Sequence, residues 1–537
     1  MFANLDVIAL RYGLCVRYFN TAGPCVTDRH YMVPANERLP EARHLAEGGF
    51  YFIVHAPRQT GKTTTMTALA WELTAAGERV ALRFSCERGE ALGEDVAAVE
   101  HAVLESINQA AFVLLPPELR PPDPWPTASA GSQVFEALQE WAVRCPLPLV
   151  LIFDEIDALR GQALNSVLRQ LRDGFSYKAH AFPDSVVLCG MRDIRDYRIA
   201  SGASPGSLRT ASPFNVAVES LRIGDFTGGE VAGLYRQHTA ETGQEFTPEA
   251  VDRAFEYTQG QPWLVNALAR EVVVKMRVAP PTPITAAHID TAKERLVLAQ
   301  ATHLDSLASK LYEPRVKRFI EPLIAGTSVE ADPTYSEDLR YVRDLGLITQ
   351  NPPVRVANPI YREVIARVLA ASTQDQVTVS PGRFVLPDGR LDIPLLLAEF
   401  TGFWLENGEF MARSGVYHEA AAQLVFMGFL QRVVNGGAFV DREYAIGSGR
   451  VDILVRKPYG DGQVQREGIE LKAWAPGRPD PLRAGLRQLD DYLDLFRLVT
   501  GTLIIFDRRP DAPPITERTA ITKATSPAGR TITLLRA

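Results

Sequence analysis

Short apolar runs alternate with amphipathic stretches through the first part of the chain. Runs that are almost entirely apolar, as is typical of strands buried on both faces, cover residues 50–54, 80–84, 149–153 and 185–190. A short strand is expected over 15–19, and the apolar spacing predicts helices over residues 39–47, 95–114, 134–143 and 164–175. Strands that alternate with helices in this way predict an α/β fold built on a parallel sheet.

The pattern changes near residue 224, where the apolar runs stop and helical spacing takes over. Helices are predicted over residues 228–239, 248–258, 264–276 and 286–298. Residues 303–370 then contain helices followed by two short apolar segments around a proline-rich turn, an order that predicts a winged helix. We therefore predict an α/β domain at 1–223, a helical lid at 224–300 and a winged-helix domain at 301–372.

A second α/β pattern follows the Pro/Gly-marked stretch at 381–389. Predicted helices over 391–405 and 417–433 precede strands over residues 439–444, 450–455, 469–473 and 501–506. The polar stretch 457–468 predicts a hairpin loop, and the tail after residue 508 predicts a covering hairpin. These elements predict a separate domain at 373–537.

Composition and charge limit the classes of protein to which this chain can belong and the compartments in which we expect it. With 46% apolar residues among 537, it has enough material for several folded cores. The net charge of -7 argues against a protein that coats nucleic acid through a uniformly basic surface. The five cysteines are scattered without metal spacing, and no apolar run is long enough to cross a bilayer. We therefore predict a cytoplasmic location without membrane contact.

A phosphate-binding loop is predicted between the strand at 50–54 and the helical pattern that follows it. Its residues are Ala56, Pro57, Arg58, Gln59, Thr60, Gly61, Lys62, Thr63 and Thr64. Gly61 lets the backbone approach a nucleotide, Lys62 reaches the β- and γ-phosphate oxygens, and Thr63 would hold Mg²⁺. Ala56 stands where the usual pattern begins with glycine.

Two carboxylates complete the predicted nucleotide site. Asp154 and Glu155 follow the apolar run at 149–153, so a parallel sheet places them beside the phosphate loop. Asp154 suits Mg²⁺, directly or through water, and Glu155 suits a water that attacks the γ-phosphate. Arg192, after the run at 185–190, is the first candidate to neutralise that phosphate, ahead of Arg195 and Arg198. The predicted cofactors are ATP and Mg²⁺.

Two other segments are candidates for the nucleotide's surroundings. Gly260 closes one predicted helix and Pro262 opens the next, which fixes a sharp corner. That corner either presses on the base or γ-phosphate or is an ordinary helix–helix turn. Residues 1–48 either line the adenine side or cap the edge of the sheet.

Acidic and basic residues converge in the last predicted domain. Side chains of a strand alternate between its faces, so Glu470 and Lys472 share one face, and Asp452 can face them from the paired strand. Asp452 and Glu470 offer oxygen ligands for Mg²⁺, while Lys472 can orient a water or stabilise developing negative charge. Glu419, on the preceding helix, is a further candidate ligand. The alternative is that these residues form the solvent face of an amphipathic hairpin.

Residues of the first three predicted domains carry a resemblance to a known family. The segments RYFNTAGP (17–24), HY (30–31) and HAPRQTGKT (55–63), with the acids at 154–157 and the GQP corner at 260–262, resemble the AAA-related STAND class of signal-transduction ATPases. They are most similar to the prokaryotic AAA-like domain proteins, over about residues 10–370. The resemblance implies a P-loop NTPase with an ATP-gated switch, in which the winged helix packs on the nucleotide domain and repositions when ATP binds.

Residues 413–507 resemble a second family, the PD-(D/E)XK nucleases. Asp452, Glu470 and Lys472 match the core motif, and Glu419 matches the acidic residue of the helix. Gln488, followed by Tyr492, matches the Gln-xxx-Tyr extension and can hold the active-site strand or contact a backbone. Val451 departs from the proline that often precedes the aspartate.

Together these patterns predict an ATP-regulated, Mg²⁺-dependent nuclease. DNA is preferred to RNA as its partner, and antiphage or mobile-element defence is the predicted setting. A repair or recombination nuclease is one alternative, and an ATP-dependent scaffold that binds nucleic acid without cutting is another. An ATP-dependent homo-oligomer is left open by the sequence.

Overall fold

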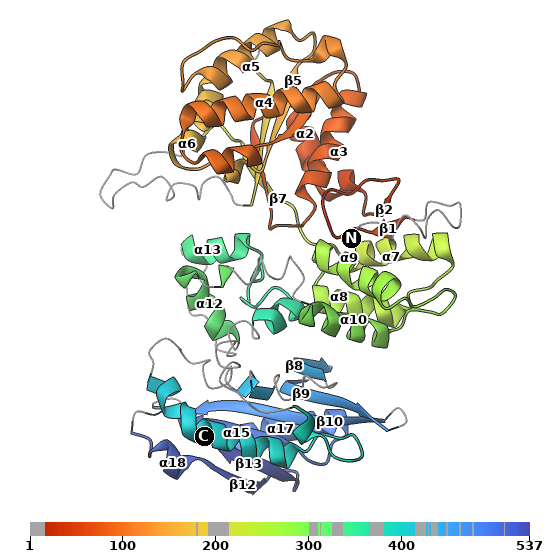
Figure 1. Cartoon of the computed structure of the whole chain (residues 1–537), viewed down its shortest axis with the longest axis vertical. Helices are drawn as coiled ribbons and strands as arrows, with labels where there is room; N and C mark the ends of the chain where they lie inside the picture. The colour runs from red at the N-terminus through yellow and green to blue at the C-terminus, as the bar shows by residue number, and fades with distance from the viewer. Residues whose placement is uncertain are drawn as a thin grey trace. The chain divides into compact units, whose positions relative to one another are not determined.

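The structure is a computed structural model of the whole chain (Figure 1). It describes residues 17–178, 181–191, 214–299, 310–311, 313–324, 337–365, 381–413, 426–427, 429–430, 439–446, 449–460, 463–474, 477–507, 509 and 511–537. By its internal contacts the chain divides into two compact units. The first comprises residues 1–296 and 332–350, and the second comprises 297–331 and 351–537. Each unit is described by itself.

A parallel five-stranded sheet forms the core of the first unit, in the order β4-β5-β6-β3-β7. Its strands are β3 (Phe52–His55), β4 (Val80–Ser85), β5 (Leu149–Asp154), β6 (Ser185–Gly190) and β7 (Glu219–Arg222). The predicted parallel sheet is confirmed, because β3 to β6 coincide with the four apolar runs. β7 was not predicted, since this edge strand carries partly exposed and polar residues instead of an apolar run.

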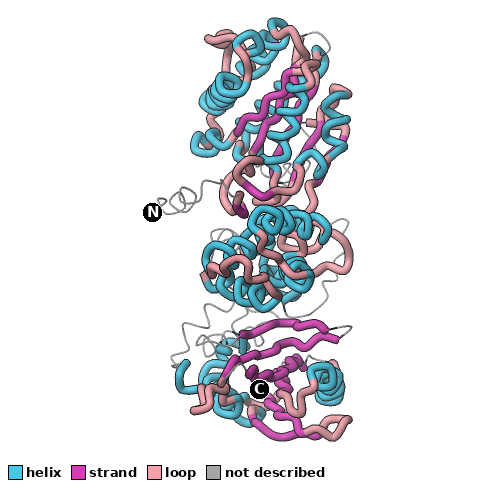
Figure 2. The backbone as a smooth tube through the Cα atoms, turned by 90° about the vertical axis from the view of Figure 1, so that its right-hand side faces the viewer, coloured by secondary structure: helices cyan, strands magenta, loops and turns pink. Residues whose placement is uncertain are grey.

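Helices cover both faces of this sheet, as the tube view also shows (Figure 2). They are α2 (Pro40–Glu47), α3 (Lys62–Ala75), α4 (Val96–Leu114), α5 (Gln133–Arg144) and α6 (Gly161–Gly174). Ile53 belongs to the core under α4, α5 and α6, whereas its neighbours Phe52 and Val54 belong to the core under α2 and α3. Successive strand residues therefore fill opposite cores, which explains why these strands are apolar throughout.

The helices after residue 224, called the lid helices below, lie close to the predicted helical ranges. They are α7 (Gly228–Thr242), α8 (Pro248–Thr258), α9 (Pro262–Arg270) and α10 (Ala286–Leu298), with a π-helical turn at Glu271–Lys275. Two short strands near the N-terminus, β1 (Tyr18–Phe19) and β2 (His30–Tyr31), pair in parallel and contact this group of helices.

A tight corner joins the lid to the sheet domain. Phe226 donates its backbone N–H to Gly260 O at 2.8 Å, and a Cβ at Gly260 would lie 1.8 Å from Phe226 O. Gly260 also has φ +79°, a conformation that side chains disfavour. The corner therefore requires glycine for two separate reasons.

We expect Gly260→Ala to lower the free energy of unfolding of the first unit by about 3 kcal/mol or more, because strain and a backbone clash add. Gly243→Ala is the matched control. Gly243 has φ +72°, but a Cβ added there would meet no atom of the described residues within 4 Å, so only about 1 kcal/mol is expected. Thermal and urea unfolding of both variants measures the difference. Equal losses in the two variants would contradict the packing argument.

Two helices lie in the predicted winged-helix region. They are α12 (Pro314–Ile324), in the second unit, and α13 (Glu337–Asp344), in the first. Ile348 and Val356 are single bridge residues, and a helical stretch follows at 359–365. The winged helix and the four-domain division stay predictions.

A mixed six-stranded sheet forms the second unit, in the order β12-β13-β11-β10-β9-β8. Its strands are β8 (Phe439–Ile446), β9 (Gly449–Tyr459), β10 (Gln463–Trp474), β11 (Thr502–Asp507), β12 (Ala520–Thr525) and β13 (Thr531–Arg536). β11 is parallel to β10 and to β13, and the other pairs are antiparallel. Helix α15 (Ile393–Arg413) contributes to one hydrophobic core against this sheet. Helix α17 (Leu482–Phe496) contributes to a second core. The predicted α/β domain is confirmed in this coarse form.

The predicted hairpin loop over 457–468 is wrong. β9 continues to Tyr459, which pairs with Gln463 of β10, and the pairing runs from there to Ile453 and Ile469. Residues 457–459 and 463–468 of the polar stretch are therefore strand. Its residues are polar because the far end of the hairpin is largely exposed, so burial on a core does not select apolar side chains there. The covering hairpin in the tail is present as β12 and β13.

Candidate functional sites

The phosphate loop joins the end of β3 to the start of α3. Gly61, the last residue before the helix, has φ +92°, and a Cβ there would lie 2.9 Å from Arg38 Nη1. Arg38 donates from Nη1 to Thr60 O at 2.6 Å and from Nη2 to Gly224 O. The left-handed backbone favours glycine at this position, whereas the guanidinium of Arg38 could move to make room for a Cβ. Arg38 was not predicted from the sequence.

The side chain of Lys62 folds back onto the first residues of the same loop. Its Nζ donates to Ala56 O at 2.7 Å and to Pro57 O at 2.8 Å. Burial lowers the pKa of Lys62, while the nearby acids, among them Asp154, act in the opposite direction. The ammonium is thus held at the mouth of the loop by neutral carbonyl groups, which leaves it able to bind a phosphate.

Asp154 and Glu155 lie at the carboxyl end of β5. Asp154 is 1% exposed and accepts from Arg83 Nη1 at 3.0 Å, and its other oxygen accepts from Glu155 N. Glu155 has φ +57° and accepts from Ser85 Oγ at 2.6 Å, and burial raises the pKa of its carboxyl. Each oxygen of Asp154 accepts one hydrogen bond and keeps a second lone pair, so Asp154 fits a contact with Mg²⁺ either directly or through water.

A cavity of about 120 Å³ opens beside the phosphate loop. Its lining includes the loop residues Gln59, Gly61 and Thr64. Residues 20–23 and Pro262, Trp263 and Asn266 of α9 line it as well. The candidate Pro262 and part of the N-terminal segment therefore lie on the cavity wall, and the two alternatives for each stay predictions.

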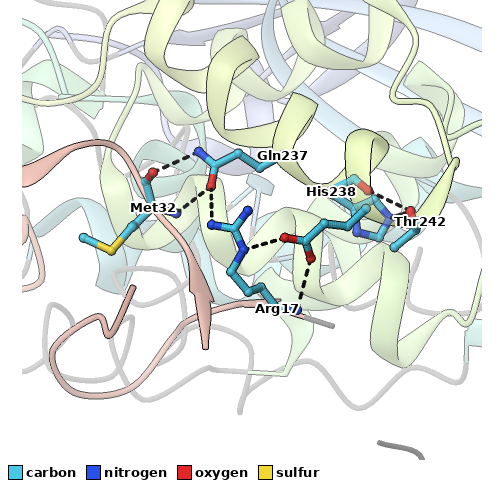
Figure 3. Close-up of polar contacts among 6 residues, drawn as sticks. Arg17, Met32, Gln237, His238 and Thr242 are labelled. Atoms are coloured by element: carbon cyan, nitrogen blue, oxygen red, sulfur yellow. Dashed lines mark hydrogen bonds and ion pairs between the residues drawn. The ribbon is translucent and has the colours of Figure 1, made fainter. Parts of the chain in front are cut away.

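Hydrogen bonds tie the N-terminal segment to the lid helices (Figure 3). Gln237 of α7 exchanges two of them with the backbone of Met32, at 2.9 and 3.3 Å, and Arg17 pairs with Glu241. Trp263 of α9 donates from Nε1 to Thr21 O at 2.9 Å. On the other side, Cys25 N donates to Thr64 Oγ1 at 3.0 Å. The segment thus bridges the phosphate-loop helix and the lid.

The second unit gathers five of the predicted residues. Lys472 Nζ donates to Glu470 Oε1 at 2.6 Å and to Gln488 Oε1 at 2.7 Å, and Gln488 Nε2 donates to Tyr492 OH at 2.8 Å. Asp452 accepts from the backbone N–H of Leu471 at 2.8 Å, between the other two strand residues. Strand alternation, β9–β10 pairing and α17 therefore bring the predicted side chains together.

Glu470 is the most perturbed member of this group. It is 0% exposed, and burial, reinforced by the charge of Asp452, raises its pKa to about 8. Its second oxygen, Oε2, has no hydrogen-bond partner within the described part of the chain. A buried carboxylate oxygen without a donor is costly, and a cation would relieve that cost. Glu470 Oε2 is therefore the atom of this group that a cation would stabilise most.

Two predicted site residues, Arg192 and Glu419, lie outside the residues that the structure describes, as do Arg195 and Arg198. Over the described ranges, no three His, Cys, Asp or Glu side chains lie close enough together to hold a metal ion. In the same ranges, no helix is both long and apolar enough to span a membrane.

Residues 47–197 match a protein family described as an AAA domain. With the loop geometry above, this part of the chain is an ATP-binding domain of the AAA ATPase type. No curated protein matches the chain.

Several solved structures share low similarity with the chain. The Walker-type ATPase PabY2304 of Pyrococcus abyssi is 14% identical over 65% of this chain and 99% of its own, with a TM-score of 0.43. The ORC2 protein of Aeropyrum pernix is 13% identical over 63% and 92%, with a TM-score of 0.40. The RuvB Holliday junction branch migration motor of Thermotoga maritima is 15% identical over 60% and 89%, with a TM-score of 0.33.

Proposed function

We propose that this chain is an ATP-hydrolysing switch that controls a Mg²⁺-dependent nuclease in its C-terminal unit. DNA is the proposed substrate, and defence against phage or mobile elements is the proposed setting. The observation that carries the nuclease is the hydrogen-bonded series Glu470, Lys472, Gln488 and Tyr492, with Asp452 on the neighbouring strand.

In the nucleotide site, each residue has a separate proposed task. The loop N–H groups and Lys62 bind the phosphates, Thr63 and Asp154 hold Mg²⁺, and Glu155 orients the attacking water. The bond from Ser85 to Glu155 fixes the direction of that carboxylate. The raised pKa of Glu155 suits a group that accepts a proton during hydrolysis.

In the C-terminal site, Asp452 and Glu470 would hold Mg²⁺, which polarises a phosphodiester when bound. Lys472 stabilises the negative charge that develops on the attacked phosphate. Gln488 positions Lys472, because its amide joins the lysine to Tyr492 on the same face of α17. Glu419 is a proposed further ligand.

Incubation of the full chain with plasmid, linear and single-stranded DNA tests this function. We expect cleavage that needs Mg²⁺ and that changes when ATP is added. Tight DNA binding without cleavage, under every divalent metal tried, would instead favour a regulatory scaffold. A preference for branched over linear DNA would favour repair or recombination.

For the ATPase half, we expect Glu155→Gln to lower the rate of ATP hydrolysis by ~10²–10³-fold, because the amide cannot accept a proton. ATP affinity should stay within about two-fold, since Glu155 makes no proposed contact with the phosphates. Phosphate release and nucleotide titration measure the two quantities. Glu105→Gln, which changes an exposed acid of α4, is the control and should leave both unchanged. Normal hydrolysis by Glu155→Gln would remove Glu155 from the mechanism.

A further inference from the structure

An aromatic ring and three arginines gather at the end of β10, beyond the proposed nuclease residues. Trp474 is the last residue of β10, and it packs against the core to which α17 contributes. Lys472 lies against the same helix, because a Cβ added at Gly485 would lie 3.4 Å from Lys472 Cγ. Side chains two residues apart on a strand share one face, so Trp474 lies on the face of Glu470 and Lys472, about 7 Å beyond the lysine.

Arg509 is held against this ring by two separate contacts. Its guanidinium carbon lies 3.6 Å from the centre of the Trp474 ring. Its Nε and Nη2 donate to the two carboxylate oxygens of Asp507, at 3.0 and 2.8 Å. A planar guanidinium that is stacked on a ring and paired through two of its nitrogens has little freedom to turn. The guanidinium therefore has a fixed direction before any ligand binds.

One amino group of Arg509 is left for a ligand. Nη1 has no hydrogen-bond partner among the residues that the structure describes, and it is not a buried atom. The side chain as a whole is 26% exposed. Oriented guanidinium N–H groups that solvent can reach are well suited to bind a phosphate.

Two further arginines lie beside the ring. The guanidinium of Arg536, which pairs with Asp480, lies 5.7 Å from the ring centre. The indole N–H of Trp474 donates to the backbone oxygen of Arg478, whose side chain is exposed. The acidic groups near Arg509 are Asp507, Asp511 and Asp480. The arginines thus create no broad positive field, and recognition here depends on directed N–H groups.

We propose that Arg509, oriented by Trp474 and Asp507, binds a backbone phosphate of the DNA next to the phosphate that is cut. Each strand of a duplex carries one phosphate per ~3.4 Å of helix axis, so neighbours of the scissile phosphate fall within the ~7 Å between Lys472 and Trp474. Such a contact fixes the register of the strand and reads no base. The inference rests on the proposed nuclease site and adds the residue that places the strand on it.

The test measures DNA affinity apart from cleavage, by the fluorescence anisotropy of a short labelled duplex mixed with the full chain in the absence of divalent metal. We expect Arg509→Ala to bind about ten-fold more weakly, the value of one charge-assisted contact. The slope of log affinity against log salt concentration should become shallower by about 0.9, since one phosphate contact is lost. With Mg²⁺ present, KM should rise about ten-fold while kcat stays within about two-fold, because Arg509 contacts no reacting group.

Arg383→Ala is the matched control. Arg383 is exposed and pairs with Glu399 of α15, which contributes to the core on the other face of the sheet, so DNA affinity and salt slope should be unchanged. Arg509→Lys keeps the charge without the planar fork and should lose most of the affinity that Arg509→Ala loses. Unchanged affinity in Arg509→Ala, or an equal loss in Arg383→Ala, would overturn the assignment.

Thermal unfolding shows whether each variant is folded, and should Arg509→Ala fail to fold, Arg509→Lys decides. A wild-type protein that binds and cuts DNA while the Arg509 variants bind it equally well would contradict this inference alone. A wild-type protein that binds no DNA would contradict the proposed function as well.

Discussion

Replacing Lys472 by alanine is expected to lower DNA cleavage by ~10²–10³-fold, the usual cost of removing one group that stabilises transition-state charge. The lysine is the link between Glu470 and Gln488, with bonds of 2.6 and 2.7 Å. Its loss also leaves the buried carboxylate of Glu470 without its cationic partner, which raises the energy of the ionised form. Cleavage rates on plasmid DNA measure the effect.

ATP hydrolysis by Lys472→Ala should be unchanged, because the residue belongs to the second unit and the phosphate loop to the first. Lys523→Ala is the control: Lys523 is an exposed lysine on β12 of the same unit, and its loss should not affect cleavage. Glu470→Gln separates charge from position. It keeps the side-chain volume, removes the metal ligand, and should be as inactive as Lys472→Ala. Cleavage at the wild-type rate by either variant would show that these residues do not form the active site.

The apolar pattern predicts central strands well and edge strands poorly. β3, β5 and β6 are buried on both faces, so nearly every residue in them had to be apolar. β7 lies at the sheet edge beside β3, and its residues are exposed or partly so. For the same reason, the sequence pattern predicts a loop where the far end of the β9–β10 hairpin lies. Burial, not strand formation itself, produces the signal in the sequence.

The C-terminal cluster could be anticipated because it depends on local rules. Alternation along one strand brings Glu470 and Lys472 together, and a hairpin partner supplies Asp452. Gln488 could be anticipated because helical spacing places it on the same face of α17 as Tyr492. Close approach of that helix also depends on Gly485, since a Cβ there would lie 2.8 Å from Leu503 Cδ1.

The wall of the cavity beside the phosphate loop could not be derived in this way. Arg38 reaches the loop from a segment before the sheet, and Asn266 comes from a helix of the lid. Their positions depend on how the N-terminal segment packs between α3 and α7, through contacts such as that of Gln237 with Met32. Residues so far apart in sequence carry no shared periodicity, so only the folded chain relates them. Pro262 was identified because the Gly-Gln-Pro corner marks it.

Lys62→Ala is expected to weaken ATP binding by ~10²-fold or more, because it removes the charge-assisted bonds to the phosphates. Folding should be preserved, since Lys62 Nζ donates to the Ala56 and Pro57 carbonyls, which can turn to water when the lysine is removed. Arg43→Ala, which removes an exposed cation from α2, is the control and should bind ATP normally. Nucleotide titration and thermal unfolding measure affinity and folding separately.

The same variant tests control of the nuclease by ATP. If ATP binding switches the second unit, DNA cleavage by Lys62→Ala should no longer respond to added ATP, while the wild-type protein and Arg43→Ala should respond alike. Glu155→Gln then separates binding from hydrolysis: it should hold the ATP-bound level of cleavage, because it binds ATP and does not turn it over. Cleavage that is identical with and without ATP in the wild-type protein would mean that the two activities share a chain but not a mechanism. Loss of cleavage in Lys472→Ala would still establish the nuclease in that case. The nuclease and its control by ATP are therefore tested by different measurements.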